Sequence, residues 1–158
     1  MLIVLTGKTA SGKDTIKDAL LLRYPNLKRV ITNTSRSPRE GEKDGVEYRF
    51  LSREQFQKGI HDGLFIEYVE YGGNLYGTQK KDIEGYINSD LLWKIDPSFS
   101  GKVKSLFKDK KIMVIYINCP EDVILQRLRE RNLPEEQIES RMADDEAFFQ
   151  EFREKYDY

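Results

Sequence analysis

A glycine loop near the N-terminus constrains this chain more than any other feature of its sequence. Residues 2–5 read L-I-V-L, residues 7–13 read G-K-T-A-S-G-K, and a helical pattern follows. Glycines let backbone N–H groups curl around an anion, and the helix points its positive end at the same anion. This is the layout of a phosphate-binding loop, or P-loop. The sequence therefore predicts a protein that binds nucleotide phosphates, with Lys13 as a point charge at the β- and γ-phosphates.

One position of the loop departs from the usual pattern. A P-loop usually carries a hydroxyl directly after its lysine, where it binds magnesium. This chain has Asp14 there, and Thr15 comes one position later. A carboxylate at that point could repel the phosphates or contact the metal, and both alternatives stay open. Thr15 is the candidate metal-binding hydroxyl.

Composition limits the classes to which the chain can belong. Its 158 residues suffice for one domain with a proper core. The 26 Lys and Arg residues nearly balance the 27 Asp and Glu residues, which argues against nucleic-acid binding through a basic surface. A single cysteine, Cys119, rules out an internal disulfide and a cysteine-built zinc cage. No leader-like segment or membrane-length apolar run is visible, so we expect a cytoplasmic protein without a membrane partner.

The apolar pattern alternates between strands and helices. It predicts strands at 2–6, 28–32, 91–95 and 112–118, and helices at about 13–24, 98–109, 121–131 and 135–155. Such alternation argues for an α/β fold, a parallel sheet covered by helices on both faces. The segment between the second and third of these strands interrupts the alternation. It contains short strands at 46–51 and 65–71, a helix capped at Ser52, a turn at 72–74 and a helix at 79–88. We therefore expect a core of 1–32 and 91–125 with an inserted subdomain at 33–90.

The insert contains a second group of candidate binding residues. Arg36 and Arg39 stand three apart in a segment stiffened by a proline, which suits a pair that clamps a phosphate, and Tyr48 can add a hydroxyl. Further along, Glu67 precedes a G-N-L-Y-G-T run at 73–78. A glutamate that accepts two hydrogen bonds from adjacent N–H donors selects guanine. Adenine has no N1–H to donate, so such a site rejects it strongly.

These motifs together resemble those of the guanylate kinase family. The family's pattern T-T-R-x-P-R-x-G-E-x-x-G-x-x-Y-x-F is followed at 34–50, with Ser35 as the one replacement, and its F-x-E and G-N-x-Y-G-[ST] runs recur at 65–67 and 73–78. The resemblance covers essentially the whole chain. It implies a P-loop NTPase-type parallel sheet with helices on both faces, a GMP-binding α+β insert, a helical lid at 126–142 and a C-terminal helix at 143–158. It also implies transfer of a phosphoryl group from ATP to GMP with Mg²⁺.

The resemblance assigns roles to individual residues. The residues that would hold the GMP phosphate are Arg36, Arg39, Tyr48 and Tyr76. Those that would read the base are Glu67, Thr78 and Thr32, and those that would lie near the base and the metal-linked waters are Glu42 and Asp96. The ATP site would comprise Gly7, Ala10, Ser11, Gly12, Lys13, Asp14 and Thr15. Three lid arginines, Arg127, Arg131 and Arg141, would join Lys13 and Arg36 in neutralising charge on the transferred group.

Two departures bear on these expectations. After Asp96 the family usually has a glutamine-glycine pair, whereas this chain has P-S-F-S-G at 97–101. The family normally continues past its Tyr-Asp pair with a strand and a helix that are absent here, and the loop after that strand helps form the adenine pocket. We therefore expect an altered donor site.

Alternatives to a GMP kinase remain open on the sequence. The acceptor could be dGMP or another phosphorylated molecule such as a ribose bisphosphate. Guanylate-kinase-like scaffold domains use the GMP site to bind phosphorylated peptides, and an impaired member would bind GMP without efficient transfer. The expected partners are small nucleotides, without nucleic acid or membrane, in a monomer or homodimer.

Overall fold

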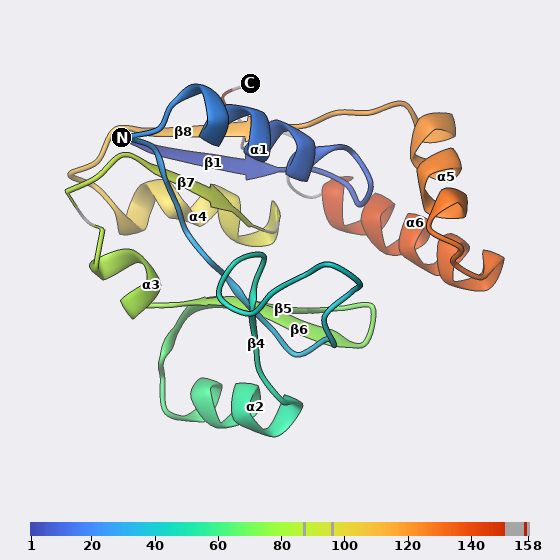
Figure 1. Ribbon diagram of the computed structural model, residues 1–158, viewed down its shortest axis with the longest axis horizontal. Helices are drawn as coiled ribbons and strands as arrows, with labels where there is room; N and C mark the ends of the chain where they lie inside the picture. Colours follow the sequence, from blue (N-terminus) through green and yellow to red (C-terminus); the bar gives the residue numbers. More distant parts are fainter. Residues whose placement is uncertain (87, 96, 151–156, 158) are drawn as a thin grey trace.

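A four-stranded parallel sheet forms the core of the computed structural model, which describes residues 1–86, 88–95, 97–150 and 157 (Figure 1). Its strands lie in the order β2 (Lys28–Arg29), β7 (Leu91–Lys94), β1 (Leu2–Thr6) and β8 (Ile112–Tyr116). Every pairing is parallel, with Val4 beside Trp93 on one side and Val114 on the other. The P-loop therefore leaves the sheet from an inner strand, β1.

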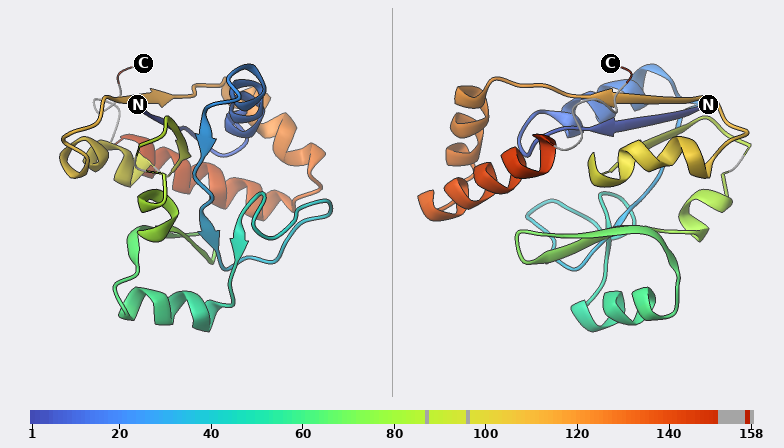
Figure 2. Two further views of the ribbon diagram at one scale, coloured as in Figure 1. Left: turned by 60° about the vertical axis from the view of Figure 1, so that its left-hand side comes forward. Right: turned by 180° about the vertical axis from the view of Figure 1, so that it is seen from behind.

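Helices cover both faces of this sheet, as the sequence predicts. Side chains alternate along β1, so Leu2 and Val4 join a core cluster that includes Val103 of α4 (Pro97–Leu106). Leu5 belongs instead to the cluster packed by Ile16 of α1 (Lys13–Arg23). Figure 2 shows α1 and α4 on opposite sides of the sheet. The predicted parallel α/β core is confirmed.

A second sheet lies beside the core sheet as a separate layer (Figure 1). Its strands run in the order β4 (Arg49–Phe50), β3 (Asn33–Thr34), β6 (Asn74–Gln79) and β5 (Phe65–Tyr71). Strands β5 and β6 form an antiparallel hairpin, and Gly72 and Gly73 between them have φ of 55° and 73°. That pair of positive angles is the geometry of a tight hairpin turn, which glycine adopts without strain.

Several predicted elements in this region have different lengths in the structure. Segment 74–79 is a strand, whereas the sequence predicts a turn at 72–74, a helix from 79 and no element between them. The helix predicted at 79–88 is the short α3 (Lys81–Glu84). The strands predicted at 28–32 and 46–51 shrink to β2 and β4, two residues each. Segment 74–79 is a strand because it pairs with β3 and β5, and no local sequence pattern predicts it.

The helix capped at Ser52 packs under the second sheet. It is α2 (Arg53–His61), and its first turn carries a capping box in which Ser52 and Gln55 exchange side-chain to backbone hydrogen bonds. Phe56 is fully buried and stacks on Phe65 of β5 with ring centroids 4.3 Å apart. The local signal and the tertiary contact agree here, so this prediction is confirmed.

Two further helices stand beside the P-loop at one end of the core. They are α5 (Glu121–Glu130) and α6 (Glu135–Gln150), and the right-hand view of Figure 2 shows both at the edge of the molecule. Leu128 and Ile138 form a buried cluster with Ala10 of the P-loop. The loop is thereby fixed against these helices. Within the described ranges, no helix has both the length and the apolar character that a membrane crossing requires.

Candidate active site

One cavity of about 340 Å³ gathers most of the predicted site residues. The P-loop lines one part of it, the second sheet another, and α5 and α6 a third. The lining includes Gly7, Ala10, Ser11, Gly12, Lys13, Asp14, Thr15, Thr32, Arg36, Arg39, Tyr48, Glu67, Tyr76, Arg127, Arg131 and Arg141. Two other predicted residues, Glu42 and Thr78, bond to residues in this lining. Asp96 lies outside the described residues.

The P-loop owes its shape to two glycine positions. A Cβ on Gly7 would lie 2.5 Å from the Ile117 carbonyl oxygen, so no larger residue fits there. Gly12 has φ of 98°, a left-handed conformation that favours glycine, and α1 begins directly after it. Lys13 Nζ donates to the Gly7 carbonyl oxygen at 2.7 Å and to that of Lys8. The lysine therefore folds back over its own loop at the start of a helix, where an anion binds readily.

Helix α6 holds the outer part of the loop through two acidic residues that the sequence analysis did not select. The buried carboxylate of Asp145 accepts hydrogen bonds from Thr9 N at 2.7 Å and from the Tyr71 hydroxyl at 3.3 Å. Burial raises the pKa of Asp145 above its ordinary value. Beside it, Glu146 forms an ion pair with Lys8 at 2.7 Å. Asp145 thus joins the P-loop to β5 of the second sheet.

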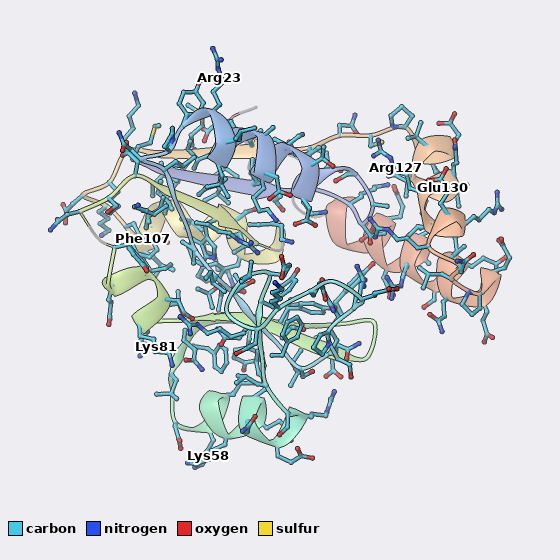
Figure 3. The ribbon with its side chains drawn as sticks, in the orientation of Figure 1. Arg23, Lys58, Lys81, Phe107, Arg127 and Glu130 are labelled. Carbon is cyan, nitrogen blue, oxygen red and sulfur yellow. The ribbon has the colours of Figure 1, made fainter. Side chains whose placement is uncertain are left out.

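Arginines give the cavity a strongly positive wall. Arg127 reaches from α5 toward the P-loop (Figure 3), and its Nη1 donates to the Ala10 carbonyl oxygen at 2.9 Å. Burial and the nearby Arg39 guanidinium lower the pKa of Arg131. Arginines placed together in this way favour a multiply charged anion between them. The positions of Arg131 and Arg141 in the same lining suit the lid role predicted for them.

The predicted phosphate clamp is preorganised by an internal ion pair. Arg36 Nη1 and Nη2 each donate to a Glu42 carboxylate oxygen at 2.6 Å, a bidentate contact. The guanidinium carbon lies 5.1 Å from the Tyr48 ring centroid, within cation–π range. Hydrogen bonding to Arg36 lowers the pKa of Glu42, and the same bond raises the pKa of Arg36. Glu42 therefore holds Arg36 against Tyr48 here, and its predicted place near the base stays a prediction.

We expect the Arg36–Glu42 pair to stabilise the fold in a pH-dependent way. The pKa of Glu42 lies below its ordinary 4.5 in the folded state, so its contribution is present above that value and is lost as pH falls below it. Urea unfolding at pH 7 should show Glu42→Gln less stable than the native sequence by about 1–3 kcal/mol. The difference should shrink as pH falls toward 3. The exposed Glu40 supplies the control Glu40→Gln, and a difference that grows with acidification would contradict the assignment.

The residues predicted to read a base face each other across the β5–β6 hairpin. Glu67 pairs with Thr78 in the strand register, and the Thr78 hydroxyl donates to Glu67 Oε1 at 2.6 Å. Trp93 Nε1 of the core sheet in turn donates to the Thr78 oxygen at 3.0 Å. Glu67 is 8% exposed. A Cβ on Gly77 would lie 2.6 Å from the Glu67 carbonyl oxygen, so glycine is needed for the two strands to approach here.

Lys94 is a member of the cavity that the sequence analysis missed. Its Nζ donates to Asp14 Oδ1 at 2.7 Å and to the Tyr48 hydroxyl at 3.0 Å. Lys17 also donates to Asp14 Oδ1, at 3.1 Å. Partial burial would raise the pKa of Asp14, but the two ammonium groups outweigh it and hold that pKa well below its ordinary value. A lysine inside the apolar run L-L-W-K-I was the available signal, because buried strands rarely carry one without a partner.

The described side chains near the P-loop do not fit a magnesium site of their own. Asp14 stands where a P-loop places its metal-binding hydroxyl, yet its carboxylate is already paired with two ammonium groups that would repel a divalent cation. Thr15 lines the cavity and offers one oxygen, and it stays the predicted contact. Across the part of the chain that the structure describes, no three His, Cys, Asp or Glu side chains gather as a metal-binding group.

Fold and site together define a class of protein. A P-loop on an inner strand of a parallel sheet, an arginine-rich wall and a facing α+β layer that presents a second anion clamp are the parts of a P-loop kinase with a phosphorylated acceptor. In such a kinase the donor phosphates are expected at the loop and the acceptor at the facing layer.

Comparison with known proteins narrows this class to one family. The chain matches the family model for guanylate kinase over residues 1–158. The guanylate kinase of Rubrobacter xylanophilus is 39% identical over 119 residues, which are 75% of this chain and 62% of that protein. The guanylate kinase of Desulfitobacterium hafniense is 32% identical over 160 residues, 100% of this chain and 80% of that one.

A solved structure agrees with these matches. The crystal structure of guanylate kinase from Anaplasma phagocytophilum superposes with a TM-score of 0.74 at 27% identity, over 100% of this chain and 74% of that one. The chain thus spans 62% to 80% of the length of these three proteins. The chain belongs to the guanylate kinase family.

Proposed function

We propose that this chain transfers the γ-phosphoryl group of ATP to the phosphate of GMP or dGMP, giving ADP and GDP or dGDP. The observation that carries the proposal is the shared cavity, in which Lys13 of the P-loop and Glu67 of the second sheet line one space. The donor phosphates would lie on the P-loop backbone and Lys13, and the guanine would lie against Glu67 and Thr78. The acceptor phosphate would then lie between them, near Arg36, Arg39, Tyr48 and Tyr76.

The residues of the site would position the two nucleotides and neutralise the charge of their phosphates. A GMP phosphate oxygen attacks the γ-phosphorus of ATP, a P–O bond forms there, and the bond to the ADP oxygen breaks. The phosphate is already ionised at neutral pH, so no side chain has to remove a proton. Arg127, Arg131 and Arg141 would approach the transferred group as the lid closes and stabilise its charge.

Magnesium is proposed here as a partner of ATP. Bound to the phosphates, it would neutralise their charge. Because the described residues do not build a site for it, no step above depends on a side-chain ligand. Cytoplasmic location, a monomer or homodimer, and the absence of nucleic-acid and membrane partners stay predictions from the sequence.

A coupled ADP-release assay tests the proposal against its alternatives. With ATP and magnesium, we expect turnover with GMP and dGMP and little with AMP, UMP or ribose 1,5-bisphosphate. Turnover with the ribose compound would indicate a kinase for another phosphorylated acceptor. Calorimetric GMP binding without turnover would indicate the binding module or the impaired member. No observation in the structure favours these alternatives, since the P-loop glycines and Lys13 all line the cavity.

A further inference from the structure

Lys94 occupies the point where the two halves of the proposed site meet. It is the last residue of β7 in the core sheet, and its side chain is 16% exposed. One contact, to Asp14, leads to the first turn of α1 beside the P-loop lysine. The other contact, to the Tyr48 hydroxyl, leads to the predicted acceptor clamp. A single ammonium group thus touches both the donor loop and the acceptor clamp.

Distance places this ammonium within reach of an acceptor phosphate. Lys94 Nζ lies 3.0 Å from the Tyr48 hydroxyl and 5.0 Å from the ring centroid. Any anion that hydrogen-bonds to that hydroxyl would come within about 6 Å of the ammonium, where opposite charges attract appreciably in a half-buried site. An ammonium has three N–H donors. Two of them have acceptors among the described residues, Asp14 and Tyr48, and the group lines the cavity.

We propose that Lys94 is a phosphate-binding residue of the reaction, and that Asp14 is the positioning residue that holds it between donor and acceptor. This inference rests on the proposed function for the identity of the acceptor. In P-loop enzymes a hydroxyl after the P-loop lysine and a carboxylate from a neighbouring strand hold magnesium between the phosphates. Here a carboxylate stands at the first position, and an ammonium at the end of the neighbouring strand is bonded to it. The pair would present the Lys94 ammonium to the phosphates, and Lys94, Asp14 and Lys17 together carry one net positive charge.

The role of Lys94 is electrostatic throughout the reaction. Its ammonium keeps its proton, because the Asp14 carboxylate and the Tyr48 hydroxyl favour the charged form against the cost of burial, and its pKa is raised. It would contact the acceptor phosphate before transfer and the transferred group during it. As the bond to GMP forms and the bond to ADP breaks, the ammonium would stabilise charge on the oxygens between them.

Two lysines that share one carboxylate provide a matched test. Lys17 also binds Asp14, but it is outside the cavity lining and its side chain is 6% exposed. Calorimetry should show that Lys94→Met weakens GMP binding, without ATP or magnesium present, by about 10- to 100-fold, as expected for loss of a charge-assisted contact. In the coupled assay kcat should fall by about 100-fold or more. Lys17→Met should change both quantities by less than about three-fold.

The outcomes separate this inference from the proposed function. Suppose that the native chain turns over GMP and that Lys94→Met keeps its GMP affinity and kcat within about three-fold of the native values. This result would overturn the role of Lys94 and leave the proposed activity standing. A native chain without turnover would overturn the proposed activity, and the affinity comparison would still decide whether Lys94 binds the phosphate. Equal losses in both variants would show that Lys94 acts only through Asp14, against the proposal. Should Lys94→Met fail to fold, Lys94→Gln retains an N–H donor group and removes the charge, with the same losses expected.

Discussion

Replacing Lys13 with alanine is expected to lower kcat by about 1,000-fold or more, while the Kd for GMP stays within about three-fold of the native value. The lysine stands at the start of α1 and folds over the P-loop, so the charge lost is the one proposed to bind the donor phosphates. The predicted acceptor clamp lies between β3 and β4 and the predicted base-reading pair on the β5–β6 hairpin, so both keep their contacts. Single-turnover kinetics and GMP calorimetry measure the two quantities separately.

A neighbouring lysine in the same loop supplies the control for this result. Lys8 bonds to Glu146 of α6 and is outside the cavity lining, so Lys8→Ala removes a positive charge without removing a phosphate contact. We expect kcat to fall by less than about tenfold in that variant. If both variants lost the same activity, loosening of α6 would explain the loss. A Lys13→Ala enzyme within about tenfold of the native rate would refute the donor role.

The core sheet could be predicted because its signals are local. Each of its strands except β2 begins with at least three apolar residues, and each helix that covers it carries apolar residues on one face. The P-loop adds glycines whose need is visible in the structure at Gly7 and Gly12. Likewise α2 was predictable from its capping residues. In these segments local preference and tertiary packing specify the same structure.

The second sheet was harder to predict because its strands depend on their partners. Strand β6 reads N-L-Y-G-T-Q, with only two large apolar residues in six positions. It is a strand because β3 and β5 flank it. Strands β3 and β4 are two residues each, too short for a period to appear. Elements of this kind are defined by long-range hydrogen bonds, which single-sequence patterns do not record.

The contacts that organise the cavity were equally invisible in the sequence. Asp14 and Lys94 are 80 positions apart, and Thr9 and Asp145 are 136 apart. Motif spacing located the residues expected at the donor and acceptor, but it gave no reason to join those pairs. It also left open whether Asp14 would repel phosphate or contact metal, and the structure instead pairs its carboxylate with lysines. A lysine in a buried strand and an aspartate at a P-loop are each anomalous alone and explain one another once paired.

Replacing Glu67 with alanine should remove discrimination between guanine and adenine. The carboxylate is buried, and its Thr78 hydrogen bond fixes its direction within the cavity. A site built around such a group rejects a base that cannot donate to it, because the carboxylate would be desolvated and unpaired. We therefore expect kcat/KM for GMP to fall by about 100- to 1,000-fold while that for AMP changes by less than about tenfold. Steady-state assays with both acceptors measure the ratio.

A second glutamate on the same strand makes the comparison specific. Glu70 is exposed and pairs with Arg53 away from the cavity, so Glu70→Ala removes a β5 carboxylate without touching the base-reading pair. That variant should keep the native preference for GMP. Thr78→Val should weaken GMP less than the loss of Glu67 does, because the hydroxyl directs the carboxylate and the carboxylate remains. If Glu67→Ala retained the native GMP-to-AMP ratio, the guanine would have to be read elsewhere in the cavity, since a buried carboxylate that faces the base and leaves selectivity unchanged has no role in choosing it.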